Sequence, residues 1–114
     1  MPIAPALKNL PPMNYTQIST EIENKYKDSP ARKRLADKCL EKGREWITTF
    51  FGEGGDIQPS DKKRVKKECA AYIRKYVDTT DERNVYGSVL LVIVMGAVIS
   101  WLIQRLLDEM FPEV

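Results

Sequence analysis

The chain has 114 residues, of which 18 are lysine or arginine, 16 are aspartate or glutamate and none is histidine, so its formal charge is +2. The missing imidazole excludes Ser-His-Asp and Cys-His mechanisms. A structural zinc site needs about four nitrogen or sulfur ligands, and the chain has only two cysteines, Cys39 and Cys69. Both fall on apolar helical stripes, where we expect buried thiols rather than a disulfide. The composition therefore predicts a protein that is not an enzyme and holds no cofactor or metal.

Residues 1–13 are the first predicted unit, an extended arm rather than a folded element. Four of the seven prolines of the chain lie in this stretch, and proline favours extended backbone. Such an arm either docks on another molecule or remains a flexible terminus. The residues leave both interpretations open.

Residues 14–78 are predicted to form a basic head of three amphipathic helices, at about 15–27, 30–51 and 59–77. Asn14 and Gln17 resemble a capping box at the start of the first helix. Ser29 followed by Pro30 is typical of an N-cap and a first helical position. Gly52 is typical of a helix end.

The second helix of the head has the strongest packing stripe. Gly43 lies on this stripe and indicates that a neighbouring helix approaches closely. The aromatic residues near the end of the helix are also a candidate partner surface: Trp46, Phe50 and Phe51. The apolar members of the stripe are Leu35, Cys39, Leu40, Trp46, Ile47, Phe50 and Phe51.

The third helix carries the densest basic run of the chain, KKRVKK at residues 62–67. Three interpretations remain open for this run: contact with anionic lipid headgroups, contact with nucleic acid phosphates, or a solvated face. An apolar segment follows about twenty residues later, which favours lipid. The apolar stripe of the helix comprises Val65, Cys69, Tyr72, Ile73 and Tyr76. The candidate lipid or phosphate contacts are Lys62, Lys63, Arg64, Lys66, Lys67 and, beyond the apolar segment, Arg105.

Residues 86–103, YGSVLLVIVMGAVISWLI, contain no charged side chain. As a helix they extend about 27 Å, close to the roughly 30 Å thickness of a hydrocarbon core, so the segment predicts a transmembrane helix. Aromatic side chains near both ends favour the headgroup layer, and Arg105 is placed to reach the far surface. The alternative is a helix buried on all sides of a globular protein, for which the chain offers little apolar material. The predicted membrane-spanning residues include Tyr86, Gly87, Val89, Leu90, Val92, Ile93, Gly96, Ala97, Ser100, Trp101 and Ile103.

The whole final unit, residues 79–111, is predicted to be one helix that begins near Thr80, behind a capping box of Thr79 and Glu82, and ends near Met110. Residues 112–114 follow as an acidic tail. Seventeen of the eighteen lysines and arginines precede the apolar segment, so the positive-inside tendency places the head in the cytosol or its equivalent. Gly96 and Ser100 form a small-xxx-small step, with Ala97 beside it. Such a step allows two helices to pack closely, but it is also common by chance, so self-association through this face and no role at all both stay open.

The sequence therefore predicts an all-α fold, a small amphipathic helical head followed by one C-terminal transmembrane helix. This layout resembles the small single-span membrane proteins of bacteriophages, including minor virion proteins that join an internal membrane to the capsid. The resemblance implies a non-enzymatic anchor or linker between a lipid bilayer and the subunits of a larger assembly, located in a membrane or a virion membrane. The alternatives are a holin-like pore-forming lysis protein and a membrane tether for nucleic acid.

Overall fold

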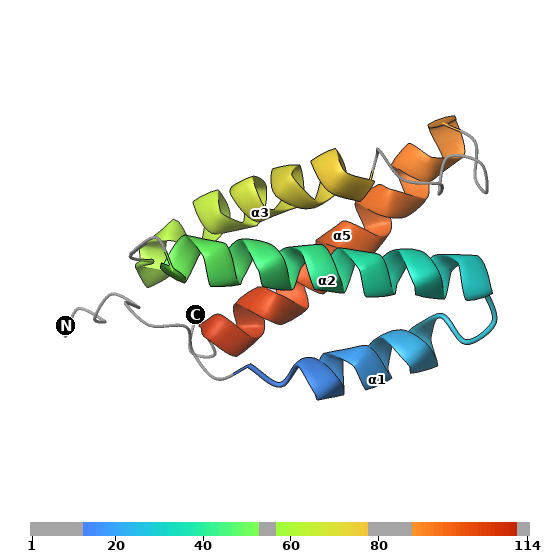
Figure 1. The fold of residues 1–114 in the computed structure, drawn as a ribbon, viewed down its shortest axis with the longest axis horizontal. Helices are drawn as coiled ribbons and strands as arrows, with labels where there is room; N and C mark the ends of the chain where they lie inside the picture. Colours follow the sequence, from blue (N-terminus) through green and yellow to red (C-terminus); the bar gives the residue numbers. More distant parts are fainter. Residues whose placement is uncertain (1–12, 53–56, 78–87, 112–114) are drawn as a thin grey trace.

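The structure is a computed structural model that describes residues 13–52, 57–77 and 88–111, with the side chains of 88–91 excepted. The described residues form an all-helical fold, as predicted. Figure 1 shows α1 and α3 on opposite sides of α2, with α5 crossing behind α2. The elements are α1 (Tyr15–Lys25), α2 (Pro30–Gly52), the short 3-10 helix η1 (Pro59–Asp61), α3 (Lys62–Val77) and α5 (Ser88–Met110).

The helices begin where their predicted capping residues lie. The Asn14 side chain accepts a hydrogen bond from the Gln17 backbone N–H at 2.9 Å and opens α1. The Ser29 hydroxyl accepts from the Arg32 backbone N–H at 3.4 Å, and α2 starts at the following Pro30. These side chains satisfy N–H groups that have no partner inside the helix. The predicted start near Thr80 and the box of Thr79 and Glu82 lie outside the described residues.

The core is a continuous set of apolar side chains from all four α-helices. α1 contributes Ile18 and Ile22, each fully buried, and the predicted stripe of α2 faces the same core. A Cβ atom placed on Gly43 would lie 3.0 Å from Cδ1 of Leu106 and 3.5 Å from Cδ1 of Ile73. The close approach predicted at Gly43 is therefore confirmed, and the helices that approach are α5 and α3.

None of the helices in the described residues combines the length and the apolar character needed to cross a membrane. The predicted C-terminal transmembrane helix is therefore wrong.

α5 instead has one long side packed in the core of the bundle. Its apolar residues recur every three or four positions past the end of the predicted span, among Arg105, Asp108 and Glu109, which is the pattern of an amphipathic helix. α2 and α3 both pack against it. Its buried residues are Val94, Met95, Val98, Ile99, Leu102, Ile103, Leu106, Leu107 and Met110, with Phe111 just beyond the helix.

Candidate interaction surfaces

The two cysteines are buried and neither forms a disulfide, as predicted. Burial raises the pKa of the Cys69 thiol to about 12, so this thiol is protonated at neutral pH and is a poor nucleophile. Among the described residues, no group of three or more cysteine, aspartate and glutamate side chains is placed to hold a metal ion.

The first surface is the outer face of α3, which we define by five exposed cationic residues. One exposed acidic residue, Glu68, lies among them and pairs with Arg64 at 3.5 Å. Arg64 also contacts Asp61 at 3.4 Å. For Lys63 and Lys67 there is no ion-pair partner within the part of the chain that the structure describes. The cationic residues of this face are Lys63, Arg64, Lys67, Arg74 and Lys75.

The predicted basic run of residues 62–67 does not stay together as one contact surface. Lys62 turns toward α5, where its Nζ lies 3.6 Å from Oδ1 of Asp108 and its side chain is 20% exposed. Lys66 is half-buried, at the edge of the α3 packing surface. The helical period separates the six residues around the axis, which explains the division. Arg74 and Lys75, which lie outside the run, complete the face.

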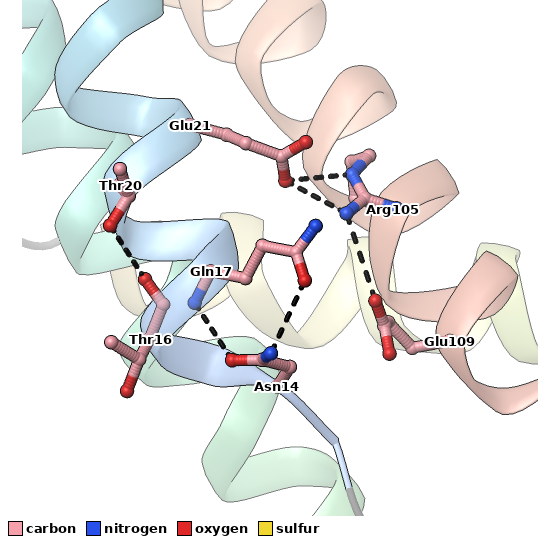
Figure 2. A network of polar contacts seen from close by, with 7 residues as sticks. All are labelled: Asn14, Thr16, Gln17, Thr20, Glu21, Arg105 and Glu109. Atoms are coloured by element: carbon pink, nitrogen blue, oxygen red, sulfur yellow. Dashed lines mark hydrogen bonds and ion pairs between the residues drawn. The ribbon is translucent and has the colours of Figure 1, made fainter.

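Arg105, predicted to reach lipid headgroups, is held inside a polar network between α1 and α5 (Figure 2). Its Nε and Nη2 donate hydrogen bonds to Oε2 of Glu21 at 3.0 and 2.8 Å. The same Nη2 lies 3.7 Å from Oε1 of Glu109, one turn further along α5. Arg105 therefore fastens α1 to α5 instead of extending from the end of the helix.

The second surface is the outer face of α5, which we define as Val92, Ile93, Gly96, Ala97 and Ser100. Val92 and Ile93 are 63% and 65% exposed, and Ala97 and Ser100 are also exposed. A Cβ atom on Gly96 would meet nothing within 4 Å. The residues of the predicted small-xxx-small step thus lie on an uncovered, uncharged face.

The other residues of the predicted span do not belong to the outer face of α5. Ile103 is buried in the core, and Trp101 is half-buried. Val89 and Leu90 belong to α5, but their side chains lie outside the description, as do Tyr86 and Gly87 entirely.

The end of α1 and the start of α2 flank the outer face of α5. Tyr26 and Arg32 share with Ile93 and Ala97 the lining of a shallow cavity of about 180 Å³. The Lys25 Nζ lies 5.2 Å above the centre of the Trp101 ring. The Tyr26 and Trp101 rings meet edge to face, with centroids 6.4 Å apart. Sequence reasoning missed Lys25 and Arg32 because their position beside α5 depends on how the helices pack.

The aromatic residues of α2 lie between core and surface. Phe51 is buried, whereas Trp46 and Phe50 are half-buried. The Trp46 and Phe50 rings stack with centroids 5.1 Å apart, and Phe50 meets Phe51 edge to face at 6.0 Å. Most of this predicted partner surface therefore packs within the molecule.

Tyr72 and Tyr76 lie at the border of α2 and α3, although their spacing suggests core positions. Tyr76 is 39% exposed, with Lys42 Nζ 5.1 Å from its ring centre. The Tyr72 hydroxyl donates to Glu45 at 3.4 Å. Val77, which the predicted stripe omits, is fully buried instead.

No protein-family model, no curated protein and no solved structure matches this chain. The described residues form a small helical bundle with a cationic exposed face on α3 and an apolar exposed face on α5.

Proposed function

We propose that this protein is a non-enzymatic structural component that links a lipid bilayer to a protein assembly and contacts the bilayer from its surface through the outer face of α3. The setting that we propose is the virion of a membrane-containing bacteriophage, in which a minor virion protein joins the internal membrane to the capsid. The single observation that carries the proposal is the exposure of five cationic side chains on this face, where the described acidic neighbours Glu68 and Asp61 both pair with Arg64.

The charge of this face suits a surface of anionic headgroups. A lysine or arginine near such a surface contributes about 1 kcal/mol to binding, and the attraction decays over a Debye length of about 8 Å at physiological salt. Lys63 and Lys67 are four residues apart, so they project from the same side of α3. Arg64 contributes less, because its charge is shared with Asp61 and Glu68.

Sedimentation of the full chain with vesicles tests the lipid contact. The wild type is expected to bind vesicles of phosphatidylserine and phosphatidylcholine but not of phosphatidylcholine alone, and added salt should release it. Replacing Lys63 and Lys67 with Gln should weaken partitioning roughly 30-fold, given about 1 kcal/mol for each residue. The matched control replaces Arg34 and Arg44, two exposed arginines of α2, with Gln. An equal loss in the control, or no binding by the wild type, would overturn the proposal.

Nucleic acid carries the same negative charge as anionic lipid. Binding of the full chain to duplex DNA is therefore measured beside its binding to the vesicles. If the full chain binds duplex DNA more tightly than the anionic vesicles, with a steep dependence on salt, the lipid proposal fails and a nucleic acid tether replaces it.

The proposed role of linker also requires that the protein binds a larger protein assembly. Material from the native source, gently solubilised and sized, should travel in fixed ratio with a large particle whose proteins and lipids are identified by mass spectrometry. A chain that runs alone, or only with its own copies, contradicts the role of linker.

A further inference from the structure

The outer face of α5 is the largest exposed apolar feature among the described side chains. Val92 and Ile93 are about two-thirds exposed, at 63% and 65%, and they follow each other on a helix whose opposite side is fully packed. Exposed large apolar side chains grouped on one face mark a contact with another apolar phase or molecule. Nothing in the core of the bundle requires them, because α5 already packs through its other side.

The flank of this face carries positive charge and amphipathic aromatic rings. Arg32 lines the shallow cavity beside Ile93 and Ala97, and no acidic residue is among the described residues that line it. Lys25 lies over the Trp101 ring, which in turn contacts Tyr26. An apolar strip bordered by cations, tryptophan and tyrosine is the composition that anionic bilayer surfaces bind, with the rings at the headgroup level.

The same flank disfavours a second copy of this chain as the occupant. An antiparallel pair of α5 helices would place Lys25 and Arg32 of one copy against Lys25 and Arg32 of the other. A parallel pair would place them toward α3, whose exposed charges are mostly positive and which lies on the other side of α2 from α1 (Figure 1). Like charges facing each other oppose both arrangements.

We propose that the outer face of α5 lies in the headgroup layer of an anionic bilayer, with Val92 and Ile93 inserted between the lipids and Lys25 and Arg32 at the headgroup phosphates. The helix lies along the surface and does not cross the bilayer. This contact rests on the proposed function, since it requires a bilayer as partner, but it uses residues separate from the outer face of α3.

Partitioning of the full chain to phosphatidylserine vesicles tests this contact. Replacing Ile93 and Ala97 with Asn leaves the net charge unchanged and should weaken partitioning about tenfold or more, because apolar area no longer leaves water. The matched control replaces Thr48 and Thr49, which are both exposed on α2, with Asn. Circular dichroism and unfolding curves verify that both variants keep the fold.

A second readout reports depth in the bilayer. In the Trp46→Phe variant, Trp101 is the remaining tryptophan, and its fluorescence should shift to the blue and be quenched by lipids brominated on the acyl chain. Normal partitioning of the Ile93 and Ala97 variant, together with an unquenched Trp101, would overturn this inference.

The two proposals fail in distinguishable ways. If the Lys63 and Lys67 variant loses binding while the Ile93 and Ala97 variant keeps it, the outer face of α5 is not a lipid contact and the proposed function stands. If the wild type does not bind anionic vesicles, both proposals fail. A dimer in sedimentation that the Ile93 and Ala97 substitutions dissociate, without an effect on vesicles, would assign the face to self-association and overturn the inference.

Discussion

The two halves of α5 differ on the side that faces away from the core. In the second half this side is polar, and the Gln104 side chain donates to Asp108 at 2.9 Å. In the first half it is apolar, with Val92 and Ile93 exposed. The half with more charged residues therefore behaves as an ordinary amphipathic surface helix, whereas the more apolar half leaves apolar area uncovered. The hydropathy of each half therefore does not predict how much of it is buried, because burial depends on which neighbouring helices pack against it.

The sharpest test of this difference compares thiols in the core with one on the outer face of α5. Wild type should not react with a thiol reagent at pH 8, because both thiols are buried and burial raises the pKa of Cys69 to about 12. The Ala97→Cys variant should gain one thiol that reacts at least roughly a thousandfold faster than the native pair, which reacts only after the core opens. Mass spectrometry of labelled protein counts the thiols. Rapid labelling of Cys69 in the folded protein would contradict the packing described for α3 and α5.

The same thiol makes the stability of the core sensitive to alkaline pH. The unfolded thiol ionises near its ordinary pKa of 9.0, whereas the folded one keeps its proton up to about pH 12. Unfolding therefore releases a proton between these values, and the free energy of unfolding should fall by up to about 1.4 kcal/mol per pH unit in this window. The Cys69→Ala variant should lack this contribution.

Truncating one side chain on the buried side of α5 and one on the exposed side should lower the free energy of unfolding by different amounts. Leu102 is fully buried, so Leu102→Ala should lower the free energy of unfolding by about 2–5 kcal/mol, through lost burial and a cavity. Ile93→Ala removes a side chain that is 65% exposed and should change stability by less than about 0.5 kcal/mol. Urea unfolding followed by circular dichroism measures both. Equal effects would mean that the two sides of α5 are not distinguished as described.

The smallest expected effect concerns the ion pair that fastens α1 to the second half of α5. Glu21 and Arg105 are joined by two hydrogen bonds, but their side chains are 37% and 22% exposed, so solvent screens the pair. A double-mutant cycle of Glu21→Gln and Arg105→Gln should give a coupling free energy of about 1 kcal/mol that decreases with salt. Glu23→Gln serves as the control, because Glu23 is exposed on α1 two residues after Glu21 and projects from another side of the helix. No coupling at low salt would show that this pair does not hold α1.

Much of the local structure follows from short stretches of sequence. The caps at Asn14 and Ser29, the end of α5 at Met110 and the burial of both cysteines agree with the predictions. Gly43 also indicates a close helix contact, although the sequence does not identify the helices that approach it. These features depend on hydrogen bonds and periodicity within a few residues, so the sequence by itself determined them.

Only the tertiary structure decided the role of α5 and the composition of the two faces. Residues 86–103 carry no charged side chain, so no charge pattern within them shows which side is buried. The partner of Arg105 lies 84 residues earlier in the chain, and Lys62 turns inward to meet Asp108. Arg32 and Lys25 reach the flank of α5 only because α1 and α2 pack beside it. Such long-range contacts leave no local signal in the sequence, and α5 was therefore predicted to cross a bilayer. In the structure, the buried side of α5 lies in the core of the bundle.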